Sequence, residues 1–145
     1  MIFTVEAVAT AIAKGLAKHE TAEIELREDF GIVGDAHAGP GLRQVSLLAG
    51  EAIDAMKAKG LALAPGAFGE NIVTRGVDWS RAKVGEWIDI GAVRLQITQI
   101  GKECHNRCAI YYSAGECIMP TQGLFAKVLK GGKIHAHSRG HYRIR

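Results

Sequence analysis

Three cysteines and one histidine, all within one short stretch, are the residue types in this sequence best suited to chemistry. Cys104, Cys108 and Cys117 are the only cysteines of the chain, and His105 follows the first of them. Lys102 and His105 place cationic or potentially cationic groups beside Cys104, and nearby cations favour the thiolate, the reactive form of a thiol. Cys104 could therefore accept sulfane sulfur as a persulfide, ligate a soft metal, or act as a covalent nucleophile.

Three further explanations of the cysteines stay open. The three cysteines and His105 offer four potential zinc ligands, but their spacing lacks the paired Cys-x2–4-Cys or His-x3–5-His pattern of structural zinc sites. Three inert, semi-buried cysteines are the plain structural explanation. A thiol hydrolase would instead need a base near Cys104, and the candidates outside the C-terminal segment are His19, His37 and His105.

A second candidate site is the glycine-rich stretch at residues 31–41, which holds four glycines and one proline. Such a composition predicts a loop whose backbone visits positive φ. Asp35 and His37 are its only ionisable side chains, and both are often simply turn residues. Alternatively, the amides of residues 34–39 could hold an anion such as a phosphate together with Arg43. The glycines match no Walker or dinucleotide-binding spacing, so nucleotide binding is unsupported.

The elements that must position these residues are mostly short strands. Alternating or short apolar runs predict strands at residues 3–9, 21–27, 43–48, 72–74, 84–90 and 93–100, the last two forming a hairpin. Apolar residues at helical spacing predict short helices at residues 51–59 and 122–130. The pattern favours a mostly β fold, a barrel-like α+β domain with a few short helices.

Length and charge indicate a single soluble domain spanning residues 1–145; its core limits, about residues 21–134, come from the family resemblance given below. From residue 118 onward there are six Lys or Arg and no acid, which predicts a basic, His-containing tail at residues 135–145. Without an aromatic series or a nucleic-acid motif, we expect this tail to be solvated and to bind no nucleic acid. There is no membrane-spanning run and no signal-peptide pattern, so we expect no membrane association, a cytoplasmic location and reduced thiols.

An ordered series of motifs resembles one known family. Along the chain it comprises GDAHAG (34–39), RQVSLL (43–48), FGENI (68–72), ITQIGKECH (97–105), CAI (108–110), CIMP (117–120) and GG (131–132). This series is similar to a stand-alone MOSC domain, the module named after the C-terminal part of molybdenum cofactor sulfurases. The resemblance covers roughly residues 21–134. It implies a β-barrel-like fold with a key cysteine at the end of a strand, which here is Cys104.

The resemblance also implies a function in sulfur transfer or molybdenum cofactor handling. Cys104 would carry sulfur as a persulfide or ligate molybdenum, and Lys102 and His105 would favour its thiolate. The pterin cofactor would contact Arg43, Asp35, His37 and Asn71, although the plainer explanation of Asn71 on its own is a turn or strand-start residue. Cys108 or Cys117 could resolve a Cys104 persulfide by forming a disulfide.

The partners follow from what the chain lacks relative to full sulfurases. It has no room for their pyridoxal-phosphate domain, so we expect no bound pyridoxal phosphate and a separate cysteine desulfurase as sulfur donor. The acceptor would be the molybdenum cofactor or a molybdoenzyme. Whether the protein is an enzyme is left open. If it is one, a sulfurtransferase-like enzyme that carries a persulfide on cysteine is the form we expect. A different class of function, a non-catalytic zinc-binding or interaction module, is the alternative.

Overall fold

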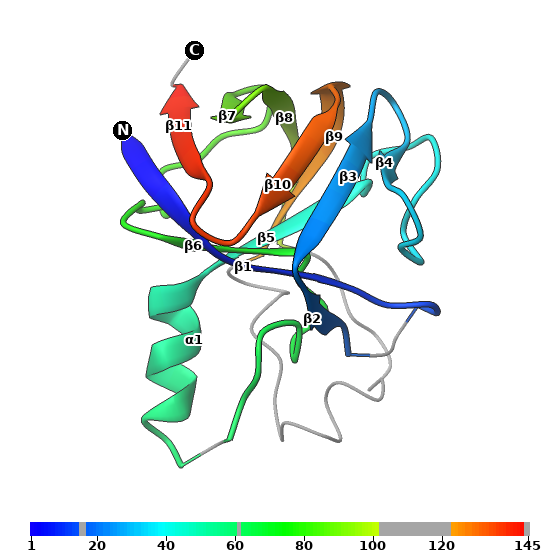
Figure 1. Cartoon of the computed structure of the whole chain (residues 1–145). Helices are drawn as coiled ribbons and strands as arrows, with labels where there is room; N and C mark the ends of the chain where they lie inside the picture. The colour runs from blue at the N-terminus through cyan, green and yellow to red at the C-terminus, as the bar shows by residue number, and fades with distance from the viewer. Residues whose placement is uncertain (15–16, 61, 102–122, 144–145) are drawn as a thin grey trace.

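The structure, a computed structural model of the chain, describes residues 1–14, 17–60, 62–101 and 123–143. Within these ranges it contains eleven strands and one helix (Figure 1). They are β1 (Ile2–Thr10), β2 (His19–Thr21), β3 (Glu23–Arg27), β4 (Gly31–Ile32), β5 (Val45–Ala49), α1 (Gly50–Lys57), β6 (Ile72–Arg75), β7 (Trp87–Ile90), β8 (Val93–Ile100), β9 (Leu124–Lys130), β10 (Gly132–His135) and β11 (Arg139–Arg143).

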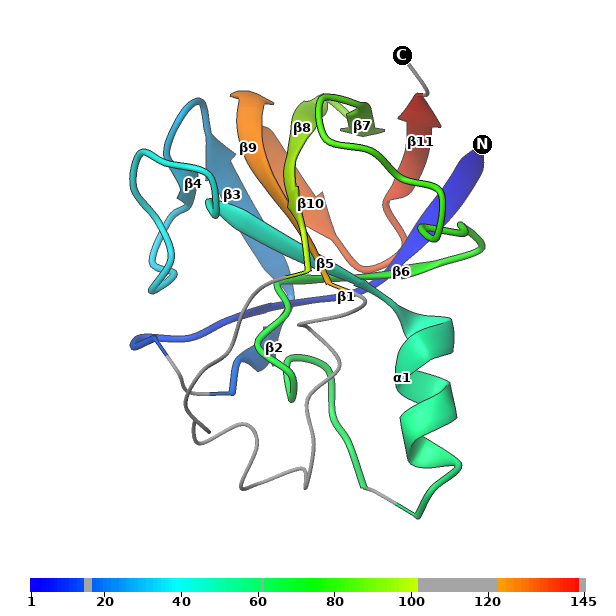
Figure 2. The ribbon, with the colours of Figure 1, turned by 180° about the vertical axis from the view of Figure 1, so that it is seen from behind.

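Seven of the described strands close into a barrel, in the order β11-β7-β8-β9-β5-β6-β1, with β1 returning to β11. Strand β2 extends the sheet from β1, and β10, β3 and β4 form a second, three-stranded sheet. The β5–β6 pair is parallel, and the other pairs around the ring are antiparallel. The first and last described strands thus lie side by side, as the positions of the two termini show (Figures 1 and 2). Closure leaves the ring itself without an unpaired edge.

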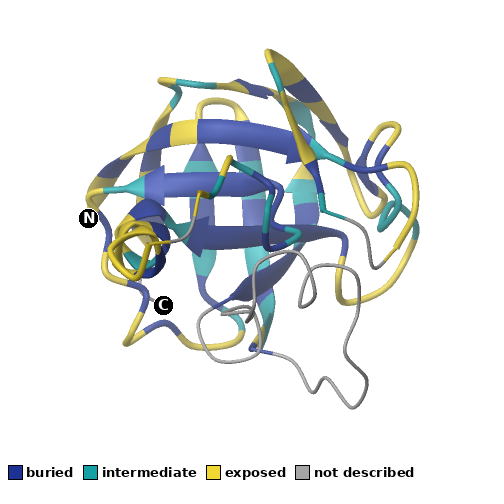
Figure 3. Cartoon of the chain, turned by 90° about the horizontal axis from the view of Figure 1, so that it is seen from below, coloured by how far each residue is buried: buried dark blue, intermediate teal, exposed yellow. Residues whose placement is uncertain are grey.

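The barrel core is built from the inward-facing residues of its strands, and a smaller cluster covers part of the outside. In β8, Val93, Leu95 and Ile97 are buried while the residues between them are half-buried, which is the period of two expected for a strand. Outside the ring, α1 packs through Ile53 and Met56 onto a cluster of buried residues: Ala7, Leu48, Phe68, Val73 and Phe125. Most positions of the barrel strands are therefore coloured as buried in Figure 3.

Most predicted elements are confirmed, including the mostly β, barrel-like fold class. The predicted strands at residues 3–9, 43–48 and 93–100 correspond to β1, β5 and β8, and the helix at residues 51–59 corresponds to α1. The predicted hairpin is the β7–β8 pair, in which Ile90 lies opposite Val93.

The predicted helix at residues 122–130 is wrong, because its described part is β9. Leu124, Ala126 and Val128 point into the barrel core, whereas Phe125 belongs to the cluster under α1. With both faces of the strand covered, apolar residues occupy successive positions and the alternation of a half-buried strand disappears. The remaining pattern happens to match helical spacing.

The predicted basic tail at residues 135–145 is also wrong as far as it is described. Residues 139–143 are β11, which pairs with β7 on one side and with β1 on the other. Gly140 and Tyr142 are buried, while Arg139, His141 and Arg143 are exposed, so the charged side chains that indicated a tail are the outer face of a strand. Because β1 and β11 both belong to the barrel, the predicted core limits of 21–134 are too narrow.

Among the described residues, no helix is long and apolar enough to cross a membrane.

The contact between β11 and β1 yields the first prediction. A Cβ added at Gly140 would lie 2.2 Å from Cζ of Phe3, which is 2% exposed. We therefore expect Gly140→Val to lower the free energy of unfolding by about 1–3 kcal/mol or more, the range for overpacking a core. Urea unfolding of the purified variant measures this change.

His141→Val is the matched control, because it places the same side chain at the next, outward-facing position of the strand. It should change the free energy of unfolding by no more than about 0.5 kcal/mol. Equal, negligible effects of the two substitutions would mean that β11 does not close the barrel.

Candidate functional site

The glycine-rich loop between β4 and β5 is the part of the predicted site that the structure describes in full. Gly39 and Gly41 have φ of 134° and 137°, which confirms the predicted backbone at positive φ. Residues with a Cβ rarely adopt such backbone angles, so these glycines let the chain turn back toward β5. The loop carries Asp35 and His37, and it places Arg43 just before the start of β5.

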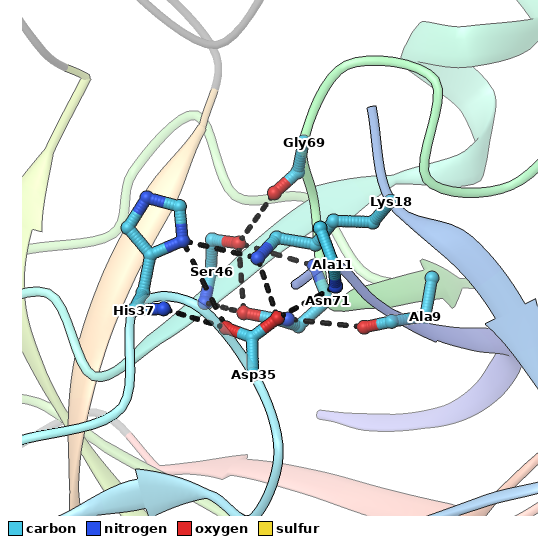
Figure 4. A network of polar contacts seen from close by, with 8 residues as sticks. All are labelled: Ala9, Ala11, Lys18, Asp35, His37, Ser46, Gly69 and Asn71. Carbon is cyan, nitrogen blue, oxygen red and sulfur yellow. Dashed lines mark hydrogen bonds and ion pairs between the residues drawn. The ribbon is translucent and has the colours of Figure 1, made fainter. Parts of the chain in front are cut away.

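Asp35 is the anchor of this loop, because its buried carboxylate is bonded at both oxygens. Oδ1 accepts hydrogen bonds from the amide of Ala11 at 3.0 Å and from Nζ of Lys18 at 2.7 Å, and Oδ2 accepts from the amide of His37 at 3.2 Å. The side chains of Asp35 and Lys18 are both 0% exposed. Nζ of Lys18 also lies 3.0 Å from Nδ1 of His37, which completes a buried Asp–Lys–His network (Figure 4).

The protonation of Asp35 follows from these contacts. Burial alone would raise the pKa of Asp35, but the nearby His37 ring, the hydrogen bond from Lys18 and the positive charge of Lys18 together outweigh it. The pKa of the carboxyl is therefore held well below its usual range. Asp35 is an ionised partner of a lysine inside the protein, a pair that is strongly disrupted if either member is removed alone.

The amides of the loop do not form the anion cradle that the sequence predicted at residues 34–39. Five successive amides, from Asp35 to Gly39, already donate to acceptors inside the protein. Those of Ala36 and Gly39, for example, donate to the carbonyls of Ala11 and Phe30 at 2.8 and 2.7 Å. An anion at this loop must therefore be held mainly by side chains.

Asn71, the other predicted cofactor contact, lies in a second buried network beside the first. Its Oδ1 accepts from the amide and hydroxyl of Ser46 at 3.0 and 3.1 Å, and its Nδ2 donates to the carbonyl of Ala9 at 3.0 Å. These bonds tie β1, β5 and β6 together below the loop (Figure 4). In this structure Asn71 and Asp35 are buried and contact protein, so their contact with a cofactor stays a prediction.

Lys18 is held in place by the turn that precedes β6. Its amide donates to the carbonyl of Gly66 at 2.8 Å, and a Cβ at Gly66 would lie 2.2 Å from the carbonyl oxygen of Lys18. Glu70 fixes the same turn by accepting from the amides of Gly66 and Phe68 at 2.8 and 3.1 Å. Burial raises the pKa of Glu70, although these amides and the charge of Lys18 favour its ionised form.

A cavity of about 450 Å³ opens beside this network, and we call it the basic pocket. The described residues that line it are Lys14, His37, Ala38, Gly39, Pro40, Gly41, Leu42, Arg43 and Gln99. The charged side chains among them, Lys14 and Arg43, are both positive, and the imidazole of His37 is 30% exposed. The pocket therefore offers hydrogen-bond donors and positive charge, which suit an anionic group.

Arg43 is oriented for this role by two contacts. Its Nε donates to Oε1 of Gln99 at 3.0 Å, and its guanidinium lies 5.3 Å from the ring centroid of Phe125. The remaining N–H groups of a guanidinium can then meet an acceptor in a fixed orientation. Arg43 and His37 are thus the two predicted residues that the structure brings to one pocket.

The predicted catalytic and resolving residues Cys104, Lys102, His105, Cys108 and Cys117 lie outside the described residues. The described ends of that segment are paired, since the amide of Gly101 donates to the carbonyl of Gly123 at 2.7 Å. Nε2 of Gln99 donates to the carbonyl of Gly101 at 2.9 Å. Gln99 therefore links Arg43 to Gly101, which directly follows β8 and lies three residues before Cys104 in the sequence.

Lys14, Lys18 and Gln99 are site residues that the sequence reasoning missed. The two lysines fall in a small-residue stretch without a clear period, so nothing there distinguished a buried lysine from a solvated one. Strict alternation would turn Gln99 inward, but the pairing of β8 with β9 shifts register between Ile97 and Gln99, and nothing local signals that shift. A carboxylate that becomes buried on folding needs a positively charged partner. This requirement at Asp35 is the signal that could have pointed to a lysine such as Lys18.

A larger cavity of about 900 Å³ lies elsewhere, between α1 and the segment that follows β6. Its described lining is mainly apolar, with Val77, Trp79 and Leu124 among the walls and Glu51 and Asp78 as acidic members. None of the described site residues predicted from the sequence lines it, and its acidic groups do not suit an anion.

The buried pair yields the second prediction. Lys18→Met removes the partner of a buried carboxylate, so we expect the free energy of unfolding at pH 7 to fall by about 3–5 kcal/mol. Urea unfolding monitored by circular dichroism measures the loss. The double variant Lys18→Met/Asp35→Leu should recover most of it, because an apolar pair of similar volume leaves no unpaired charge.

The same pair sets a pH dependence. Because the pKa of Asp35 is lower in the folded than in the unfolded state, its stabilisation is fully present above the unfolded pKa of about 3.9 and is lost as the pH falls toward the folded value. The difference in stability between the wild type and Asp35→Asn should therefore be largest near neutral pH and shrink below about pH 4. A difference that stays constant down to pH 2 would contradict the ionised pair.

Comparison with known proteins was made by family and by structure. The family model that matches is the MOSC domain, over residues 34–139. YuaD from Bacillus subtilis is similar in structure with a TM-score of 0.81 at 18% identity, covering 100% of this chain and 98% of that chain. YiiM from Escherichia coli has a TM-score of 0.68 at 21% identity, covering 100% of this chain and 71% of that chain. None of the curated protein sequences matched.

The family match runs through the glycine-rich loop, Arg43, the strands from β5 to β10 and the cysteine segment. It spans well over half of the sequence, and the solved structures share the same barrel. The chain belongs to the MOSC domain family.

Proposed function

We propose that this protein is a sulfur-carrier or molybdenum-cofactor-binding domain that works through the thiolate of Cys104. The observation that carries the proposal is the family match over residues 34–139, which includes Cys104 and every described residue that lines the basic pocket except Lys14. The MOSC family is linked to molybdenum cofactor sulfurase-like function. The finer assignment to sulfur transfer or cofactor binding rests on the chemistry of the residues themselves.

The basic pocket supports binding of an anionic ligand, and its size of about 450 Å³ suits a small molecule. The pterin of the molybdenum cofactor ends in a phosphate, which would find donors in Arg43, Lys14 and His37. These residues fit the phosphate because the charged side chains among the described lining are basic. When bound, the cofactor would supply a molybdenum centre, a metal that soft thiolate ligands such as Cys104 match.

Sulfur transfer would use Cys104 as the nucleophile. Its thiolate would attack the terminal sulfur of a donor persulfide, so that the donor's sulfur–sulfur bond breaks, the donor leaves as a thiolate and a persulfide forms on Cys104. The exchange needs no external oxidant, because one persulfide replaces another. Lys102 and His105, its sequence neighbours, would favour the thiolate.

Release of the sulfur could use a second cysteine. The thiolate of Cys108 or Cys117 would attack the inner sulfur of the Cys104 persulfide, forming a disulfide and releasing hydrosulfide. Alternatively, the terminal sulfur passes directly to an acceptor such as the molybdenum cofactor or a molybdoenzyme. The donor in either case would be a separate cysteine desulfurase, which carries its own pyridoxal phosphate.

The third prediction concerns sulfur loading. After incubation with a cysteine desulfurase and cysteine, we expect the intact mass of the wild type to rise by one sulfur atom and to return to its starting value on reduction. The thiolate of Cys104 is the expected acceptor, so Cys104→Ser should show no gain. Intact mass spectrometry under non-reducing conditions measures both.

Cys108→Ser and Cys117→Ser are the matched controls, since each removes one thiol and leaves Cys104 in place. Both should still gain the sulfur atom, and the one that removes a resolving thiol should retain it longer. No gain in the wild type, with the desulfurase shown to be active, would sink the persulfide carrier and leave cofactor binding.

The fourth prediction concerns the cofactor. Arg43→Gln should weaken binding of the molybdenum cofactor about 10- to 100-fold, because a hydrogen bond to a charged group contributes about 1.5–3 kcal/mol. Anaerobic fluorescence titration measures the dissociation constant. Arg81→Gln, a change at an exposed arginine that is not among the described lining of the pocket, should leave it unchanged, and equal effects of both variants would count against the pocket as the phosphate site.

A further inference from the structure

The buried Lys18–Asp35 pair touches the basic pocket through one side chain, that of His37. Nδ1 of His37 lies 3.0 Å from Nζ of Lys18 and faces into the network. The other ring nitrogen, Nε2, points away from the network, as Figure 4 shows. His37 lines the basic pocket. The ring therefore has one nitrogen among buried groups and the other directed away from them, in a residue that lines the pocket.

The identity of the neighbours fixes which ring nitrogen carries the proton. An ammonium group has three donors and no acceptor, and Nζ of Lys18 lies 2.7 Å from Oδ1 of the buried Asp35. The contact between Nζ and Nδ1 can therefore form only if Nδ1 accepts. A neutral lysine amine that accepted from Nδ1–H would leave the carboxylate of Asp35 buried without a counter-charge, which is strongly unfavourable.

Asp35 itself gives Nδ1 no alternative acceptor. Nδ1 lies 3.8 Å from Oδ2 of Asp35, beyond the range of a hydrogen bond. That oxygen instead accepts from the backbone amide of His37. Among the described contacts of Nδ1, the hydrogen bond donated by Lys18 satisfies both the ammonium group and Nδ1. The ring proton therefore belongs on Nε2.

We infer that Lys18 and Asp35 act as positioning residues that hold His37 in its Nε2–H tautomer, so that His37 is a hydrogen-bond donor in the wall of the basic pocket. With Arg43 and Lys14, the pocket then presents three donor side chains. Such a set matches a group made of acceptors alone, which identifies the ligand class as an oxyanion such as a phosphate monoester. A ligand that presents an N–H or O–H group to Nε2 meets no acceptor there.

Burial of the ion pair agrees with this role. Removing a lysine and an aspartate from water is costly, and an apolar pair of the same volume would stabilise a protein as well or better. An apolar pair could not, however, donate to Nδ1. The inference rests on the proposed function only in assigning an anionic ligand to the basic pocket, whereas the tautomer of His37 follows from the geometry alone.

Nuclear magnetic resonance of the uniformly ¹⁵N-labelled wild-type protein tests the tautomer directly. Long-range ¹H–¹⁵N correlations near neutral pH should show Nδ1 of His37 as an unprotonated nitrogen and Nε2 as a protonated one. The signals are assigned by their loss in His37→Gln. A proton on Nδ1, or protons on both nitrogens, would overturn the inference.

Lys18→Met then tests the positioning role, after its folding has been checked by circular dichroism. Without a donor to Nδ1, the His37 signals should move toward a mixture of the two tautomers, and an unchanged Nε2–H tautomer would show that Lys18 does not select it. If this variant does not fold, the comparison of two His37 variants described next decides the matter, because they leave the pair intact.

Inorganic phosphate is the probe of the ligand class. A glutamine amide can replace Nε2–H as a donor, whereas an asparagine reaches only as far as Nδ1. His37→Asn should therefore weaken phosphate binding about tenfold and His37→Gln less than about threefold, as expected for loss of one hydrogen bond to a charged group. Equal losses, or no phosphate binding by the wild type, would overturn the assignment of the ligand. Failure of sulfur loading with the tautomer and phosphate binding intact would refute the persulfide-carrier part of the proposed function and leave this inference standing.

Discussion

Closure of the barrel by β11 is the constraint on which the rest of the structure depends. This strand satisfies the edges of both β1 and β7, so the ring has no open side through which its core would meet water. Tyr142 of β11 also donates a hydrogen bond to the buried Glu86, and its ring lies 5.0 Å from that of Trp79. Burial and the bond to Glu86 raise the pKa of Tyr142, so the phenol remains a donor at physiological pH. The last described strand thus joins the core instead of trailing from it.

The closed ring also determines the geometry of the basic pocket. Phe125 packs with the cluster under α1, and its ring lies beneath the guanidinium of Arg43. The hydroxyl of Thr98 in β8 contacts the carbonyls of both Leu42 and Phe125, which joins the end of the glycine-rich loop to two barrel strands. Arg43 is therefore fixed by side chains that are themselves fixed by the core. A pocket supported in this way can bind with little reorganisation, which is the structural condition for specificity.

Sequence reasoning identified structural features that follow from local residue patterns. It missed features that depend on residues far apart in the sequence. The barrel-like class, the β7–β8 hairpin and the glycine-rich loop follow from alternation and turn residues, and they are confirmed. Strand β9 was misassigned because Phe125 on its outer face joins the apolar cluster under α1, and no local pattern reveals such a neighbour. The basic C-terminal residues resembled a tail because their inward partners, Gly140 and Tyr142, are a small residue and a polar aromatic. Asp35 was predicted as a cofactor contact, but its partner Lys18 lies 17 positions earlier in the chain and is brought to it only by folding.

A ligand site must both attract its ligand and discriminate it from others, and the buried ion pair contributes to the second requirement. Arg43 and Lys14 provide charge, which attracts any anion, and charge alone discriminates poorly between anions. A histidine adds direction, but a free imidazole can offer either ring nitrogen as donor or acceptor. An ammonium at Nδ1 removes that ambiguity, and the ammonium can be buried there only because Asp35 balances it. The pocket must present one fixed pattern of hydrogen-bond donors, and this requirement explains why the protein buries a costly ion pair.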